Sequence, residues 1–302
     1  MSSSKRAEAS RVSEPPPTYS SVEDIAMGPD QLEAFQAVAA KYEISNLFAL
    51  KLRRLEAYNI VIIADDSGSM RTPSSAGLSV ANPFAATLTR WDELKSTVQT
   101  VTEIASTLDK DGIDVYFLNR PPIRNIMGPS SELDNAFLTP PQGYTPIARV
   151  LRQVLNEKWR GVRQEDRKKL LVLIPTDGEP TTDKGVDDKQ GLRQVLLHER
   201  GARGEVLITF LACTDDDAEI EYLNAWDNNI PDLDVVDDFN TEKRQIQGVQ
   251  GPKFPFSRGD WVCKMLLGAL DPEVDALDEI PLDRFRRGST RRKSKPQGCI
   301  IS

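Results

Sequence analysis

The chain has 302 residues, of which 39% are hydrophobic, and a formal net charge of -8, so it can bury one large core or two smaller ones. No apolar segment approaches the roughly 20 residues of a membrane-spanning helix, and no hydrophobic stretch follows Met1–Arg6 as it would in a secretory signal. The cysteines, Cys213, Cys263 and Cys299, are too few for a disulfide framework. We therefore expect a soluble fold in the cytoplasm.

The order of predicted elements indicates a single α/β domain between two arms. Residues 1–29 are rich in Ser and Pro and are expected to be disordered, and residues 30–57 show the pattern of a helical lead-in. Strands are predicted at 59–64, 114–118, 170–174, 205–213 and 233–237, and helices at 91–108, 145–159, 187–200, 217–226 and 258–270. This alternation predicts a doubly wound, mainly parallel sheet with helices on both faces over residues 58–272. Residues 273–302 are expected to form a basic flexible tail.

A carboxylate and two hydroxyls follow the first predicted strand. The β-branched run Asn59–Ala64 is typical of a strand buried on both faces, and it leads directly into Asp65, Ser67 and Ser69. Open α/β sheets place their ligands at the carboxyl ends of their strands. Because these side chains offer hard oxygen donors, they suit Mg²⁺ or Mn²⁺ better than a soft metal.

Two later segments supply further oxygen donors. Thr145 precedes Pro146 at the start of an amphipathic pattern, which predicts Thr145 as a helix N-cap with Pro at the first helical position. Farther along, the apolar run 170–174 leads into Thr176 and Asp177. We expect Thr145 to face the same crevice as Asp65, and the strand that leads into Asp177 to end at the same edge of the sheet.

These three segments resemble the metal-ion-dependent adhesion site of von Willebrand factor type A domains, which begins with the pattern D-x-S-x-S and continues with a Thr and a T-D-G element. The resemblance covers roughly residues 45–272 and implies the fold of that family. It also implies that Ser67, Ser69 and Thr145 bind Mg²⁺ or Mn²⁺ directly, while Asp65 and Asp177 act mainly through bound water. A partner protein's Asp or Glu would then complete the metal's coordination. Tyr144 departs from the family's frequent Gly-Gly-Thr-Pro.

Other interpretations of the same residues remain open. Asp65 and Asp177 are also compatible with simple capping of strands and helices in an ordinary sheet. A hydrolase that uses the metal to activate water would need a general base, for which only Asp66 and Glu179 lie nearby. The chain has no phosphate-binding Gly-rich loop and no Cys/His zinc spacing. We therefore do not expect an enzyme.

The C-terminal sequence predicts a lipid anchor. Cys299 is followed by two aliphatic residues and Ser302, which is the pattern of a prenylation box of the type usually farnesylated. One prenyl chain binds membranes only marginally, but the basic residues between Arg284 and Lys295 would add attraction to an anionic membrane surface. Because the excess of basic charge is confined to this tail, we expect no nucleic-acid partner. Nuclear import is the main alternative for the basic run.

The N-terminal arm contains a possible partner motif. Pro16, Pro17 and Tyr19 match the P-P-x-Y ligand of WW domains, which docks as an extended polyproline segment. A generic Pro-rich arm explains the same residues equally well. The sequence thus favours a membrane-tethered, metal-dependent protein-binding domain. The alternative is a membrane-anchored adaptor that recruits a WW-domain ubiquitin ligase and uses the folded domain as a scaffold.

Overall fold

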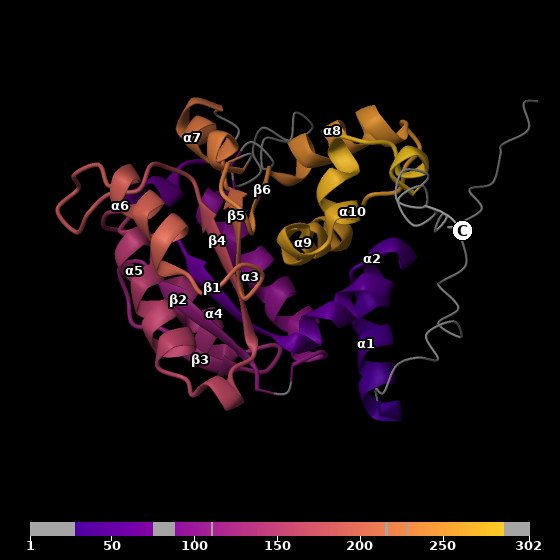
Figure 1. Ribbon diagram of the computed structural model, residues 1–302, viewed down its shortest axis with the longest axis horizontal. Coiled ribbons are helices and arrows are strands. Elements are labelled where there is room, and N and C mark those ends of the chain that lie inside the picture. The colour runs from indigo at the N-terminus through magenta and orange to yellow at the C-terminus, as the bar shows by residue number, and fades with distance from the viewer. Residues whose placement is uncertain (1–27, 75–87, 110, 215–216, 228, 287–302) are drawn as a thin grey trace, which may run out of the picture.

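The computed structural model describes residues 28–74, 88–109, 111–214, 217–227 and 229–286 (Figure 1). Its centre is a six-stranded sheet in the order β3-β2-β1-β4-β5-β6. The strands are β1 (Tyr58–Ala64), β2 (Ile113–Phe117), β3 (Ile123–Ile126), β4 (Lys169–Thr176), β5 (Val206–Ala212) and β6 (Leu233–Val236). Neighbouring strands are parallel, except that the edge strand β3 is antiparallel to β2. The predicted mainly parallel sheet is confirmed.

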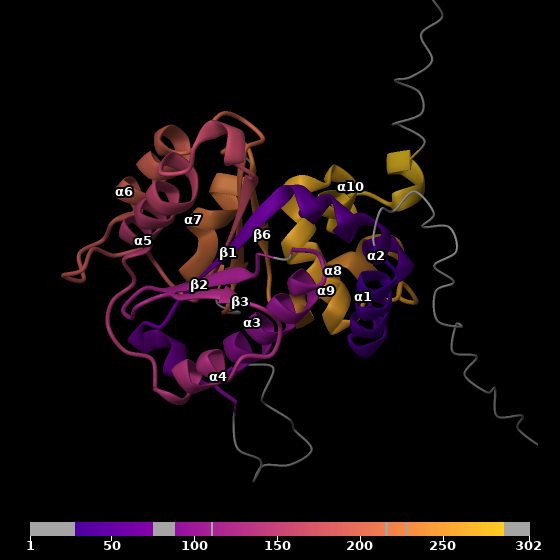
Figure 2. The same cartoon turned by 90° about the horizontal axis from the view of Figure 1, so that it is seen from below.

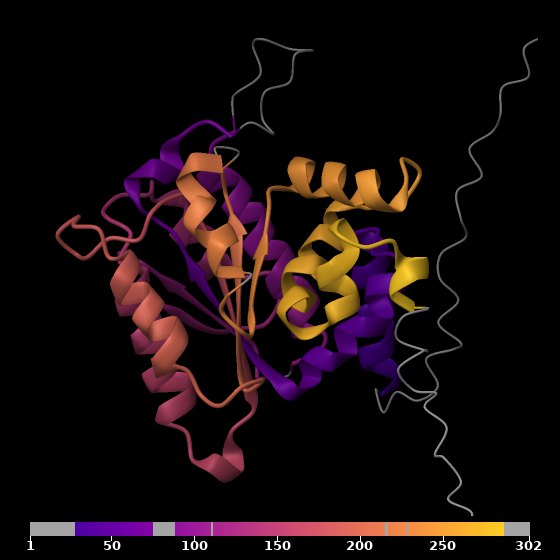
Figure 3. The ribbon, with the colours of Figure 1, turned by 45° about the horizontal axis from the view of Figure 1, so that its top comes forward.

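Helices cover both faces of this sheet, as predicted (Figures 1 and 2). One face packs against α5 (Ile147–Val154), α6 (Lys189–Gln194) and α7 (Asp217–Asp227), with π-helical turns at Leu155–Arg160 and Val195–Glu199 that continue α5 and α6. The other face packs against α1 (Pro29–Lys41), α2 (Asn46–Leu52), α3 (Arg90–Ser106), α4 (Ser131–Leu138), α8 (Phe239–Gln250), α9 (Arg258–Leu267) and α10 (Pro272–Asp275). Figure 3 shows α9 and α10 beside the indigo helices α1 and α2, with α8 packed on α9, all away from α5 and α6.

The central strands are continuously apolar because they contribute to two cores. In β1, Ile60 and Ile62 belong to the core that includes α3 and α9, whereas Val61 and Ile63 belong to the core that includes α5 and α6. Successive side chains of a strand point to opposite faces, so a strand covered on both sides is apolar at most of its positions; Thr209 in β5 is a buried exception. This arrangement explains why the run Asn59–Ala64 could be identified from sequence.

Four elements were not predicted. β3 and α4 lie between the predicted strand at 114–118 and the predicted helix at 145–159, α8 follows the last predicted strand, and α10 lies at the start of the expected tail. β3 is a short edge strand in which only Ile123 and Ile126 are buried, and α8 is a mostly polar helix that buries Ile246 and Glu242. Such elements carry little hydrophobic periodicity, because only one narrow side of each contacts the core.

Both flanks of the domain are more extensively packed than expected. The helical lead-in forms α1, α2 and a 3₁₀ turn at Arg53–Ala57, and Phe48 and Leu52 are fully buried against the same core as α9. Within the expected tail, α10 is followed by a 3₁₀ turn at Ala276–Asp278, and Val274 and Leu277 are fully buried. The packed unit therefore extends beyond residue 272, because these apolar side chains complete the core around α8 and α9.

The two predicted partner and lipidation motifs, Pro16, Pro17 and Tyr19 in the arm and Cys299 in the tail, lie outside the described residues. Across the ranges that the structure describes, no helix has both the length and the hydrophobicity needed to cross a membrane.

Candidate functional site

The candidate site lies where two central strands end side by side. β1 and β4 are parallel neighbours, and the Asp65 N–H donates to the Pro175 carbonyl at 3.2 Å. The chain leaves β1 through α3 on one face of the sheet and leaves β4 through α6 on the other. The carboxyl ends of strands whose connections diverge in this way are where open α/β sheets bind ligands.

Two serines and an aspartate from these strand ends form one hydrogen-bonded group. The Ser69 hydroxyl donates to Asp177 Oδ1 at 2.7 Å, and the hydroxyl oxygens of Ser67 and Ser69 are 3.0 Å apart. Ser67 and Asp177 are buried, whereas Ser69 is exposed. The structure therefore brings these predicted site residues together, with an opening to solvent at Ser69.

Asp65, like Asp177, is almost completely buried. Its carboxylate accepts hydrogen bonds from the Ser67 N–H at 2.9 Å and from the Thr176 hydroxyl at 2.6 Å. Burial, and after it the nearby charge of Asp177, raise the pKa of Asp65 to about 7, although these hydrogen bonds favour the ionised form. Thr176 was not among the predicted site residues, yet it fixes the orientation of Asp65.

Thr145 is on a loop that is hydrogen-bonded to the serine segment. The Gly68 N–H donates to the Gly143 carbonyl at 3.1 Å, and the Thr145 N–H donates to the Thr181 hydroxyl at 3.0 Å. Thr145 is buried. It is not the predicted N-cap, because α5 begins at Ile147 and the capping position is Pro146, which provides no side-chain hydrogen bond.

Tyr144, the departure from the family pattern, presents a half-exposed ring beside Thr145. The ring rests on Gly185, where an added Cβ would lie 2.4 Å from Tyr144 Cε1. Gly185 also has a φ of +75°, a conformation that other residues rarely adopt. The loop that carries Gly185 is thus shaped to support an aromatic surface next to the candidate site.

Asp66, although adjacent to Asp65, belongs to a different set of contacts. Its Oδ1 accepts hydrogen bonds from the Asn119 backbone N–H at 2.8 Å and side-chain amide at 3.1 Å, and its Oδ2 is 2.9 Å from Arg120 Nε. Its negative charge is therefore balanced by Arg120. Of the two acids considered as general bases, Asp66 is paired in this way and Glu179 contacts Lys189.

Arg90 also belongs to the candidate site and was not predicted from the sequence. It begins α3, and its guanidinium lies 2.9 Å from Asp177 Oδ2. Burial alone would lower its pKa, but the hydrogen bond and charge of Asp177 raise the pKa of Arg90 above its ordinary value. The local sequence signal was the capping box formed by Thr89 and Asp92, which fixes where the helix starts but not what Arg90 contacts.

The donor set suits a hard cation. Hydroxyls from Ser67 and Ser69 and carboxylates from Asp65 and Asp177 converge here, and oxygen ligands of this kind favour Mg²⁺ or Mn²⁺. Within the described ranges, no three His, Cys, Asp or Glu side chains come together in a group that could hold a metal ion. Any metal at this site would therefore depend on the serine hydroxyls as well as on carboxylates.

Comparison of the sequence with protein-family models and with curated proteins finds no match to either.

Proposed function

We propose that this protein is a metal-dependent protein-binding domain of the von Willebrand factor A type. The observation that supports the proposal most is the convergence of Ser67, Ser69 and Asp177 in one hydrogen-bonded group at the ends of β1 and β4. The resemblance in sequence and the order of the strands agree with it.

In this proposal Ser67, Ser69 and Thr145 hold Mg²⁺ or Mn²⁺ through their hydroxyls, while Asp65 and Asp177 contribute through bound water. The ion would supply an electrophilic position for an Asp or Glu carboxylate of the partner. Two contacts within the chain support this arrangement: Thr176 orients Asp65, and the loop that carries Thr145 is hydrogen-bonded to the serine segment through Gly143 and Gly68. Tyr144 provides an aromatic surface for the partner's neighbouring residues.

We further propose that the domain is held on the cytosolic face of a membrane. Farnesylation of Cys299 would provide one anchor, and the basic residues of the tail would add attraction to anionic lipids at about 1 kcal/mol each. This combination meets the need of a singly prenylated protein for a second membrane signal.

The test is partner capture from lysate followed by mass spectrometry. Wild-type protein and Ser67→Ala/Ser69→Ala are compared, each in Mg²⁺ and in excess EDTA. We expect a set of proteins to be lost both with the metal and with the hydroxyls. If every captured protein survives both treatments, the adhesion site does not function, and Tyr19→Ala then tests whether the arm recruits the partner instead.

A further inference from the structure

The carboxylate of Asp177 is already fully engaged within the chain. Its Oδ1 accepts the Ser69 hydroxyl at 2.7 Å, and its Oδ2 accepts the Arg90 guanidinium at 2.9 Å. Side-chain exposure is 10% for Arg90 and 0% for Asp177. Where solvent exposure is this low, a charged hydrogen bond is strong, and a carboxylate without a cation lowers the stability of the fold.

Arg90 therefore provides the positive charge that this pair of strand ends requires. Asp65 and Asp177 are two buried carboxylates at the adjoining ends of the parallel neighbours β1 and β4. A divalent cation among the same residues would bind carboxylates whose negative charge Arg90 already balances in part. The cation would also be repelled by the guanidinium. Arg90 and the metal thus compete for the same negative charge.

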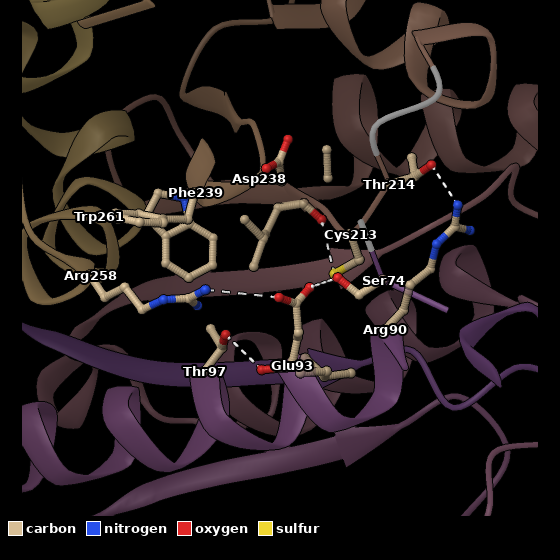
Figure 4. A pocket seen from close by; sticks show the side chains of 13 residues that line it. Ser74, Arg90, Glu93, Thr97, Cys213, Thr214, Asp238, Phe239, Arg258 and Trp261 are labelled. Atoms are coloured by element: carbon tan, nitrogen blue, oxygen red, sulfur yellow. Dashed lines mark hydrogen bonds and ion pairs between the residues drawn. The ribbon is translucent and has the colours of Figure 1, made fainter. Parts of the chain in front are cut away.

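Arg90 also has a second set of partners on the side away from Asp177. Its other terminal nitrogen donates to the Thr214 hydroxyl at 2.8 Å and lies 3.3 Å from the Glu219 carboxylate. Arg90 lines a pocket whose wall includes Glu93 and Thr214, and Figure 4 shows the guanidinium reaching toward Thr214 at one end of that pocket. The guanidinium therefore keeps a hydroxyl and a carboxylate as partners when its contact with Asp177 is lost.

We propose that Arg90 is an internal counter-cation that competes with the divalent metal for Asp177 and so sets the metal affinity of the site. When the metal binds, Arg90 gives up its contact with Asp177 and keeps those with Thr214 and Glu219. This inference rests on the proposed metal site and adds to it a residue that determines how readily the site is loaded.

The first test measures the dissociation constants of Mg²⁺ and Mn²⁺ by titration calorimetry for wild type and Arg90→Gln. Removal of the competing charge is expected to tighten binding about tenfold, within the usual range of coupling between two linked sites. Arg120→Gln is the matched control, because it removes a similarly placed arginine that pairs with Asp66 rather than with Asp177. Its effect on affinity is expected to be much smaller.

A second variant should act in the opposite direction. Glu219→Gln leaves Asp177 as the only carboxylate paired with Arg90 among the contacts named here, so Arg90 gives up Asp177 less readily and metal binding becomes weaker. Arg90→Lys keeps a positive charge and should bind metal more weakly than Arg90→Gln. If Arg90→Gln is too unstable to purify, Glu219→Gln and Arg90→Lys still test the proposal.

Thermal unfolding gives a readout that does not depend on any partner. In EDTA, Arg90→Gln should melt below wild type, because the buried Asp177 has lost its cation. Mg²⁺ should then raise the melting temperature of Arg90→Gln by more than it raises that of wild type. Tighter binding in Arg90→Gln with weaker binding in Glu219→Gln supports the proposal. Unchanged or weaker binding in Arg90→Gln overturns it, while leaving the metal site intact. If wild type and all variants bind neither cation, both the metal site and the role of Arg90 are refuted.

Discussion

Gly259 lies directly against the backbone carbonyl of Tyr42. A Cβ added at Gly259 would be 2.1 Å from that oxygen, so the start of α9 touches the end of α1 at a distance that only glycine permits. The adjacent Asp260 carboxylate accepts the Ser45 backbone N–H at 2.7 Å. The N-terminal helices are therefore held against the last long helix of the domain by backbone contacts as well as by their apolar side chains.

Gly259→Ala is expected to lower the free energy of unfolding by about 1–3 kcal/mol, the usual cost of overpacking. The Tyr42 carbonyl is backbone and cannot rotate away, so α1 and α9 must separate. The matched control is Gly248→Ala in α8, where an added Cβ meets nothing within 4 Å and alanine should stabilise the helix by about 0.5–1 kcal/mol. Urea unfolding measures both. Equal effects in the two variants would contradict the close contact.

A buried lysine holds α9 to its neighbours. Lys264 and Glu242 are each 1% exposed, and Lys264 Nζ lies 2.8 Å from the Glu242 carboxylate and 3.3 Å from Asp278. Lys264→Met should cost about 3–5 kcal/mol at neutral pH, because it leaves buried carboxylates without a cation. The loss should be smaller at pH 5, where Glu242 is protonated. An equal loss at both pH values, measured by urea unfolding, would show that Lys264 acts through packing alone.

The same cluster predicts how stability depends on pH. Burial raises the pKa of Glu242 from 4.5 to about 7. The charges of Asp278 and Asp237 also raise this pKa, whereas the charge of Lys264 lowers it. Between these values the folded state holds a proton that the unfolded state has released. Stability is therefore highest at the acidic end of this window and falls as pH rises toward about 7, by at most about 1.4 kcal/mol per pH unit for this group.

Glu242→Gln removes this titration and should flatten the decline of stability between pH 4.5 and pH 7. The raised pKa of Lys264 does not produce the same trend, because its stabilising charge is fully present below pH 10.5. The measurement is the free energy of unfolding in urea at several pH values for wild type and variant. Parallel curves for the two proteins would rule out Glu242 as the group responsible.

Divalent metal should stabilise the folded protein if the proposed site binds it. At 100 times its dissociation constant, Mg²⁺ is expected to add about 2.7 kcal/mol to the free energy of unfolding. Ser67→Ala/Ser69→Ala should abolish this gain. Ser96→Ala, an exposed serine on α3, should preserve it. Thermal or urea unfolding with and without Mg²⁺ checks the prediction, and a gain that survives in the double variant would place the metal elsewhere.

The proposed lipid anchor predicts a change of location in cells. Cys299→Ser removes the only thiol in the prenylation pattern and should move the protein from the membrane fraction to the soluble fraction. Ser302→Leu is the matched control, because it favours geranylgeranyl over farnesyl and should keep the protein on membranes. Fractionation followed by immunoblotting measures both. A Cys299→Ser protein that stays with membranes would refute the anchor.

The central strands and their polar ends could be predicted because their signals are local. An apolar run followed by Asp65, Ser67 and Ser69 marks a buried strand and its carboxyl end without reference to any other part of the chain. The same holds for the strand that ends before Asp177. Elements that bury only a narrow side, such as β3 and α8, left no comparable pattern. The sequence did not predict that packing extends beyond residue 272, because the short helices around Val274 contribute only isolated apolar residues.

The sequence by itself determined the kind of fold and most members of the candidate site, because hydrophobic periodicity and strand ends follow from neighbouring residues. Only the tertiary structure decided which charges meet. Arg90 and Asp177 are 87 positions apart in the chain, and Asp66 is paired with Arg120 although it stands next to Asp65. Such pairings depend on how β1, β4 and α3 are placed relative to one another at one edge of the sheet. The pattern of residues along a single segment does not predict that placement.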